Sequence, residues 1–436
     1  MTGNNHQQKK INMTKIIKNK GAIALAAIML VSVMEINAQD WAQWRGDNRE
    51  GIVKAAGLKL DWSQKTPTLS WTFRQAGSGY SAPVIVGTTL YCQGADDGSD
   101  FAFSLDIRTG NLIWKQKLGA QFTESRGNGP RGSVTVDNGK LYLIRGGGQI
   151  HCLSAADGKM IWQKDFKDDF AGKMMSGWGF SESPLIDGNL VICSPGGDQG
   201  TVVALDKNTG ALVWRAGELT ENASHSSAIV ADVNGIRQYI VLTAKSAAGL
   251  SAKDGKLLWK TPVEGPRVAA VIPTPVFHNN MVYITNGYNV GCILAKLTRN
   301  GDGVDAEIVY ENKNIVNQHG GVVLMNGYIY GFSDGVGFVC QNLETGETVW
   351  RERINEVIKG AVLAVNDRLL LLNERSGLLT IIAASPDGWK EFGRMPFPER
   401  TKIMTQDNMV WTHPVVADGK LFLRDHDLLF CFDLTK

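Results

Sequence analysis

The sequence predicts an all-β fold: an eight-bladed β-propeller of four-stranded antiparallel blades, with the last blade closed by both termini of the domain. Three observations support this prediction. A turn phrase recurs along the 436 residues at intervals of 40 to 52 residues. Short apolar runs separated by glycine-containing turns fill each interval, and residues 39–436 contain no ten-residue segment of convincing helical period. Four-stranded units repeated around a channel have a period of this length.

Residues 1–38 are predicted to be a cleaved signal peptide. Five lysines precede the apolar run Ala22–Val33, and the small residue Ala38 stands at a suitable cleavage point. The twelve-residue run is too short to anchor the chain across a bilayer. Met13 heads a more conventional signal and is an alternative start. No cysteine precedes Cys92, so we expect an exported protein, periplasmic or secreted, with neither a lipid anchor nor a transmembrane segment.

The charge of the mature chain gives no electrostatic reason to expect a nucleic-acid partner. The formal net charge is +2, and residues 1–38 contribute +4, so the remaining residues carry −2. A nearly neutral domain lacks the basic surface that nucleic-acid binding requires. We expect a monomer whose partner is an envelope protein, a small molecule or a glycan.

The six cysteines are expected to be mostly free, buried thiols. Cys152, Cys340 and Cys431 stand just before copies of the recurring turn phrase, at the position that Ala204 holds in another copy. A position of this kind is typical of small buried apolar residues. One disulfide among Cys92, Cys193 and Cys292 remains open at this stage.

A strap segment is expected at residues 39–67, followed by the propeller at residues 68–436. The repeated phrase is Leu-Asp-x-x-Thr-Gly-x-x-x-Trp, in which an aromatic residue lies four positions after the glycine. Its copies are LDIRTGNLIW (Leu105–Trp114), LSAADGKMIW (Leu153–Trp162), LDKNTGALVW (Leu205–Trp214), LSAKDGKLLW (Leu250–Trp259), NLETGETVW (Asn342–Trp350) and AASPDGWKEF (Ala383–Phe392). A diverged copy with an insertion begins LAKLTRNGDG (Leu294–Gly303) and runs to its aromatic residue, Tyr310.

The chemistry of the phrase predicts a tight turn followed by a packing residue. Asp and Thr side chains bond to nearby amides, and glycine allows a left-handed backbone. The small residue before the turn is expected to leave room that the tryptophan fills between adjacent blades. Each ring would bury about 150–250 Å², which contributes several kcal/mol at about 25 cal/mol per Å².

The end of the chain predicts how the ring closes. The 44 residues between Phe392 and Lys436 make one more period but supply only three strands. The segment LSWTF, residues 69–73, is the missing fourth strand and carries the aromatic residue Trp71. Closure of this kind removes the free edges of the sheet array.

Three short motifs are interpreted as turns. Gly331–Gly335 matches G-x-S-x-G, but strand-like segments lie on both sides and no helix follows. Gly127–Gly132 matches G-x-G-x-x-G and also precedes strands. Asn300–Asp305 lacks the bidentate glutamate of a calcium loop.

A candidate ligand site is expected at the mouth of the channel. The segments that lead into the first strand of each blade approach the channel, and they carry polar and aromatic side chains that differ from blade to blade. The alternative is that these loop ends are simply solvated. The candidate residues are Arg131, Trp178, Glu182, His225, His319, Lys359, Trp411 and His413.

The repeat resembles the tryptophan-docking repeat of the pyrroloquinoline-quinone (PQQ) propellers, over essentially all of residues 68–436. The segment DWAQWRGDNREG (Asp40–Gly51) also resembles the N-terminal segment of quinoprotein dehydrogenases and their exported relatives. That family includes eight-bladed alcohol and glucose dehydrogenases and the non-catalytic BamB-type factors of outer-membrane protein assembly.

The resemblance implies two alternative functions. The dehydrogenases use adjacent bonded cysteines, a calcium ion held by a carboxylate and an amide, and an aspartate base. Here no two cysteines are adjacent, and only Glu182 lies at a comparable place. The compact chain is closer to the BamB type, so the leading hypothesis is a non-catalytic envelope scaffold without a cofactor or metal.

The first alternative is a PQQ-dependent oxidoreductase. In it the quinone would lie near Trp178 or Trp411, Arg131 or Lys359 would face its carboxylates, and calcium would bind at Glu182. A second alternative is a carbohydrate- or polymer-binding accessory protein, because aromatic channel mouths suit sugars.

Overall fold

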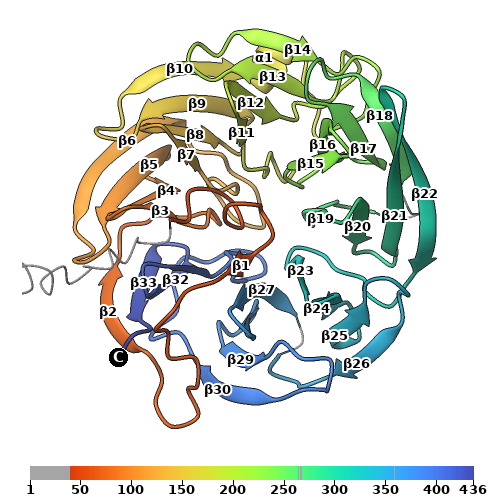
Figure 1. Ribbon diagram of the computed structural model, residues 1–436. Helices are drawn as coiled ribbons and strands as arrows, with labels where there is room; N and C mark the ends of the chain where they lie inside the picture. Colours follow the sequence, from red (N-terminus) through yellow and green to blue (C-terminus); the bar gives the residue numbers. More distant parts are fainter. Residues whose placement is uncertain (1–39, 264, 266–267, 358) are drawn as a thin grey trace, which may run out of the picture. The chain divides into compact units, whose positions relative to one another are not determined.

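The computed structural model describes residues 40–263, 265, 268–357 and 359–436, and residues 39–436 form one compact unit. This unit is an eight-bladed β-propeller, as the sequence predicts (Figure 1). In each blade the first strand is nearest the channel and the fourth is at the rim. The predicted signal peptide lies outside the described residues.

Blades 1 to 4 follow one another along the chain. Blade 1 contains β3 (Val84–Val86), β4 (Thr89–Asp96), β5 (Ser99–Asp106) and β6 (Leu112–Ala120). Blade 2 contains β7 (Thr135–Asp137), β8 (Lys140–Ile144), β9 (Gln149–Ser154) and β10 (Met160–Asp165), followed by the short helix α1 (Phe166–Phe170). Blade 3 contains β11 (Leu185–Asp187), β12 (Leu190–Cys193), β13 (Val203–Asp206) and β14 (Leu212–Arg215). Blade 4 contains β15 (Ile229–Val233), β16 (Ile236–Leu242), β17 (Ser246–Ser251) and β18 (Leu257–Pro262).

Blades 5 to 8 complete the ring. Blade 5 contains β19 (Val276–His278), β20 (Met281–Asn286), β21 (Gly291–Asn300) and β22 (Gly303–Asn312). Blade 6 contains β23 (Val322–Met325), β24 (Tyr328–Ser333), β25 (Gly337–Asn342) and β26 (Thr348–Glu352). Blade 7 contains β27 (Gly360–Val365), β28 (Arg368–Asn373), β29 (Leu379–Ala383) and β30 (Glu391–Met395), and blade 8 contains β31 (Val415–Ala417), β32 (Lys420–Asp425), β33 (Leu428–Asp433) and β2 (Thr68–Phe73).

The pairing of β2 with β33 confirms the predicted closure of the ring. The two strands are antiparallel, and Trp71 lies opposite Cys431. Arg424 of β32 adds a second link between blades 8 and 1. Its buried guanidinium donates to the carbonyl oxygens of Ser81 and Gln93, at 2.7 Å each. The N-terminal strand β2 is therefore joined to the C-terminal strands within blade 8, and a buried cation joins blade 8 to blade 1.

The repeated turn has the predicted chemistry. In blade 3, Asp206 Oδ1 accepts hydrogen bonds from the amides of Asn208 and Thr209, at 3.0 and 2.9 Å. Gly210 ends the turn with a φ of 71°, in the left-handed region. The three segments that resemble other motifs are turns or loops as well. For example, Gly331–Gly335 spans the end of β24 and the hairpin turn to β25.

The repeat tryptophans pack between blades, and the small residue before the turn leaves room for them: a Cβ added to Gly249 in blade 4 would lie 2.0 Å from Trp259. The small residue before the turn is the cross-strand neighbour of the tryptophan in its own blade, as with Cys152 and Trp162. The ring extends to the turn glycine of the next blade, so that a Cβ on Gly210 would lie 2.8 Å from Trp162. The indole also donates to the carbonyl oxygen of Lys207, at 3.0 Å. The turn of blade 3 therefore provides a glycine surface and a carbonyl acceptor for its neighbour, and the turns of blades 1 and 2 do the same for Trp71 and Trp114.

This contact predicts a difference between two glycine substitutions in blade 3. Gly188 has a φ of 57° and open space around its missing Cβ, so Gly188→Ala should cost only the left-handed backbone strain, about 1 kcal/mol. Gly210→Ala should cost at least about 1 kcal/mol more, because the new methyl group collides with Trp162. Urea unfolding of both variants measures the difference. Equal losses would contradict the docking contact.

Blade 7 departs from the predicted repeat. Phe392 was expected to be the docking aromatic residue, but it is the extra residue of a β-bulge, and Gly393 pairs with Ile381 in its place. Trp62 of the strap packs against Gly393, and its amide donates to Phe392 O at 2.6 Å. A strap residue therefore occupies the space beside Gly393, where the repeat would place the docking aromatic.

Each of the eight rim strands carries a β-bulge at the repeat aromatic position. In blade 1 the extra residue is Ile113, directly before Trp114, and its side chain is exposed. A bulge interrupts the row of free backbone groups that another strand would need for pairing. The rim is therefore protected against edge-to-edge association although apolar side chains are exposed there.

The strap contacts all eight blades at the channel. Its strand β1 (Ile52–Val53) pairs in parallel with β27, so the seventh sheet has five strands where four were predicted. The part of the strap up to β1 lies near the centre of the ring in Figure 1, and the chain then runs outward to the rim beside β30. In blade order, its contacts are Trp41 with Ile85, Ala42 with Val136, Arg49 with Pro184 and with Ala228, Trp44 with Thr274, Arg45 with Val322, Ile52 with Ala364, and Trp44 with His413.

Two buried strap arginines provide several of these contacts. Arg49 donates to the carbonyl oxygens of Ser183 and Ala228, at 3.0 and 2.9 Å, and to that of Pro184. Arg45 donates to Val322 O. Burial lowers the pKa of Arg49 to about 9 and that of Arg45 to about 10, so both stay charged at neutral pH. The guanidinium groups satisfy carbonyl groups that the inner ends of the blades direct at the channel.

All six cysteines are free and buried, which resolves the open question about a disulfide. No helix among the described residues is long and apolar enough to cross a membrane.

Candidate functional site

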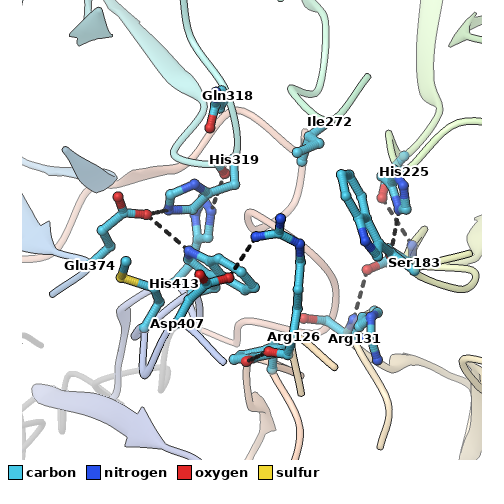
Figure 2. Close-up of a pocket in the computed structure, with 18 of the residues that line it drawn as sticks. Arg126, Arg131, Ser183, His225, Ile272, Gln318, His319, Glu374, Asp407 and His413 are labelled. Carbon is cyan, nitrogen blue, oxygen red and sulfur yellow. Dashed lines mark hydrogen bonds and ion pairs between the residues drawn. The ribbon is translucent and has the colours of Figure 1, made fainter. Parts of the chain in front are cut away.

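A cavity of about 580 Å³ occupies the channel, bounded by the segments that lead into the inner strands (Figure 2). Trp44 belongs to its lining, so the strap forms part of one wall. The other lining residues used below come from the lead-in segments and from hairpin turns of the blades, and they are Tyr80, Glu124, Arg126, Arg131, Ser133, Trp178, Ser181, Ser183, His225, Tyr288, Gln318, His319, Lys359, Glu374, Arg375, Asp407, Trp411 and His413.

Seven of the eight predicted site residues line this cavity. The repeat therefore locates the channel mouth correctly, although whether these residues bind a ligand stays a prediction. The seven are Arg131, Trp178, His225, His319, Lys359, Trp411 and His413.

Glu182 is the residue that lies elsewhere. Its neighbours Ser181 and Ser183 face the cavity, whereas Glu182 is 2 % exposed and accepts a hydrogen bond from the amide of Ser194. Successive side chains of an extended segment point to opposite sides, which accounts for the difference. Burial raises the pKa of Glu182 to about 7, and hydrogen bonds from Ser194 and the charge of Arg49 offset only part of that rise.

The rings of His225 and His413 are held by hydrogen bonds, and the ring of His319 lies beside a carboxylate. His225 lies between two hydroxyl groups, those of Ser176 and Ser181, at 2.9 and 2.8 Å. His319 Nε2 is 3.4 Å from a carboxylate oxygen of Glu374, and His413 Nε2 is 3.0 Å from the carbonyl oxygen of His319. Burial is the main cause that lowers the pKa of each histidine to about 3. All three are therefore neutral at physiological pH.

These histidines predict a loss of stability in acid. These histidines take up protons near pH 6.5 in the unfolded chain and only near pH 3 in the folded chain, so the stability that they contribute is complete above pH 6.5 and is lost as pH drops toward 3. Each histidine contributes at most about 1.4 kcal/mol per pH unit. His225→Gln should therefore flatten the dependence of Tm on pH between 6.5 and 4. His278→Gln, at an exposed position, is the matched control, and identical slopes in the two variants would refute this assignment.

Three of the four Arg and Lys side chains that line the cavity are paired with carboxylates, and Arg375 is the exception among the described residues. Arg126 Nη1 is 2.6 Å from Asp407 Oδ2, and Lys359 Nζ is 3.2 Å from Asp334 Oδ1. Arg131 is bound by Glu124 and by the carbonyl oxygens of Gly127 and Gly129, at 2.8 Å each. An anionic ligand would have to compete with these carboxylates at three of the four cations, and only Arg375 offers a cation without a carboxylate partner among the described residues.

Sequence reasoning missed several lining residues for identifiable reasons. Arg126 and Asp407 lie in lead-in segments that the sequence singles out, but their pairing joins positions 281 residues apart. Glu374 and Tyr288 follow β28 and β20, in hairpin turns that reach the same cavity. Trp44 comes from the strap, for which the repeat predicts no position. Only Arg126 and Asp407 could have been found from the sequence, because both lie in the lead-in segments.

The residues of the cavity do not fit the calcium and quinone of the oxidoreductase hypothesis. Among the described residues there is no cluster of three or more His, Cys, Asp or Glu side chains that could hold a metal ion. Glu182, the expected ligand, lies outside the cavity lining. Arg131 and Lys359, expected to face the quinone carboxylates, already bind Glu124 and Asp334.

Comparison with known proteins places the chain in one family. A sequence model described as "Outer membrane protein assembly factor BamB" matches residues 102–352. The protein of that name from Burkholderia pseudomallei is 24% identical over 371 residues, which cover 80% of this chain and 83% of that protein. Tetrathionate hydrolase of Acidithiobacillus ferrooxidans is 27% identical over 237 residues, which cover 50% of this chain and 44% of the hydrolase. The chain thus spans less than half the length of that second relative.

Solved structures agree with the fold. The crystal structure of BamB from Moraxella catarrhalis has a TM-score of 0.59 at 15% identity, covering 84% of this chain and 98% of that chain. A europium-containing methanol dehydrogenase has a TM-score of 0.52 at 12% identity, covering 89% of each chain. At these identities the likeness concerns the fold alone. Because the family model matches more than half of the chain, the protein belongs to the family of outer membrane protein assembly factor BamB.

Proposed function

We propose that this protein is an exported, non-catalytic scaffold of the cell envelope that supports outer-membrane protein assembly and needs neither cofactor nor metal. The match to BamB proteins along most of their length supports this proposal. Apart from the eight blades, the described chain consists of the strap and connecting segments. A compact propeller of this kind suits a protein that binds partners through its loops.

One observation carries the non-catalytic part of the proposal. The cavity cations Arg126, Arg131 and Lys359 each face a carboxylate of the same chain. A quinone with several carboxylates would have to displace those partners and leave partly buried acids unpaired, which is unfavourable. Internal charge pairing therefore favours a scaffold over a quinone enzyme.

The test combines a cellular and a biochemical measurement. Deleting the gene in the organism that encodes it should lower the amount of folded β-barrel protein in the outer membrane, and the wild-type gene should restore it. The purified protein, incubated with PQQ and calcium, should show neither a bound chromophore nor dye reduction. Unchanged barrel levels would overturn the assembly role, and dye reduction would overturn the non-catalytic role.

A further inference from the structure

We propose that the central cavity is a binding site for a neutral saccharide of about two sugar rings. The volume of about 580 Å³ lies within the range of small-ligand pockets. This inference goes beyond the assembly role and does not depend on it. It is derived from the aromatic faces, the paired charges and an unpartnered hydroxyl group of the cavity.

The aromatic side chains of the cavity are partly exposed and held in place. Trp411 donates its indole N–H to Glu374 Oε2, at 2.9 Å, and its ring lies 5.1 Å from that of Tyr80. Trp178 is fixed from another segment, with the guanidinium of Arg126 4.9 Å from its ring centre. Rigid aromatic rings offer apolar faces to the C–H surface of a sugar with little loss of conformational entropy.

The polar groups of the cavity suit hydroxyl groups better than ions. In the Arg126–Asp407 pair, the guanidinium keeps further N–H donors and the carboxylate keeps free lone pairs, side by side. Neighbouring sugar hydroxyls, which both donate and accept, match such a pair. Lys359 binds Gln318 and Asp334 and retains one N–H donor in the same way. A neutral ligand can use these groups without separating the ion pairs.

A buried hydroxyl group also lacks a partner. Ser133 lines the cavity and is 1 % exposed, and its Oγ has no hydrogen-bond partner among the described residues. Its backbone amide donates to the hydroxyl of Ser183, at 2.9 Å. Buried polar groups are costly unless they are satisfied. A hydroxylated ligand would supply the missing hydrogen bond.

The direct experiment is calorimetric titration of the full chain with defined disaccharides. The neutral probes are cellobiose, maltose, mannobiose and diacetylchitobiose, and the acidic probe is digalacturonic acid. The acidic probe is included because Arg375 lines the cavity and, unlike Arg126, Arg131 and Lys359, forms no ion pair among the described residues. We expect at least one neutral probe to bind and to change the tryptophan fluorescence.

Absence of binding by every neutral probe at millimolar concentration would overturn the inference. Tenfold tighter binding of digalacturonic acid would overturn the neutral-ligand class. Either failure would leave the effect of gene deletion on barrel proteins unchanged, so the two proposals fail separately.

Two variants locate the site. Trp178→Ala should weaken binding at least tenfold, whereas Trp389→Ala, at a partly buried tryptophan outside the cavity lining, should not change it. Asp407→Asn preserves the side-chain shape but leaves Arg126 without its carboxylate. That variant should bind the neutral probe several-fold more weakly and the acidic probe more tightly. Unchanged binding in both Trp178→Ala and Asp407→Asn would overturn the location.

Discussion

Replacing Arg424 by methionine should lower the free energy of unfolding by about 3–5 kcal/mol. The guanidinium donates to five carbonyl groups, those of Ala76, Gly77, Ser81, Gln93 and His426, at 2.7 to 3.2 Å. Methionine fills similar space but donates no hydrogen bond, so these buried carbonyls lose their partner. Denaturant unfolding measures the loss.

The affected carbonyls also predict where the structure opens. Four of the five belong to residues 76–93, which lead into and form blade 1, whereas Arg424 belongs to blade 8. Hydrogen exchange should therefore rise first in β2, β33 and β3, where the ring closes. Arg74→Met is the control, because its ion pair with Glu399 is exposed and worth at most about 1 kcal/mol. A loss below 1 kcal/mol in Arg424→Met would show that strand pairing alone closes the ring.

Arg49→Met is expected to release the strap and to cost about 3 kcal/mol or more. Arg49 donates to three carbonyl groups from the segments that lead into blades 3 and 4, and also to Gln43 Oε1 at 2.9 Å. Arg49→Lys should lose most of the same stability, because an ammonium group lacks the planar fork that reaches several acceptors. Limited proteolysis should cut the strap of both variants faster than that of the wild type. Wild-type resistance would mean that β1 pairing holds the strap without Arg49.

The pH dependence of Arg49→Met separates loss of contacts from loss of charge. The pKa of Glu182 is raised to about 7, so the stability that this group contributes is complete below about pH 4.5 and is lost as pH rises through 7. Arg49 is the cation that favours the ionised form of Glu182. Without it the pKa of Glu182 should rise further, so the decrease should extend to higher pH and be larger in total. The double variant Arg49→Met, Glu182→Gln should abolish that added decrease.

Features that repeat were predictable because each follows from local chemistry. The Asp206–Gly210 turn closes through its own side-chain hydrogen bonds, and the same pattern marks the blades along the chain. The spacing of these turns predicts the blade count, and the incomplete last period predicts the pairing of β2 with β33. The residues at the channel mouth were predictable for the same reason, because the segment that leads into the first strand is equivalent in every blade.

Features that occur once could not be predicted in this way. The fit of Trp62 against Gly393, the position of Glu182 behind its serine neighbours and the guanidinium contacts of Arg49 have no second copy from which a rule could be drawn. Each depends on where residues far apart in sequence meet once the ring has closed.

The amino-acid order by itself therefore determined the eight blades, their closure and seven of the residues around the channel, because short-range turn chemistry repeats regardless of the remaining structure. Only the tertiary structure decided that a strap fastens to every blade and that three of the cavity cations are paired, as with Arg126 and Asp407. Such contacts join distant parts of the chain, and their energies depend on burial that exists only in the closed ring.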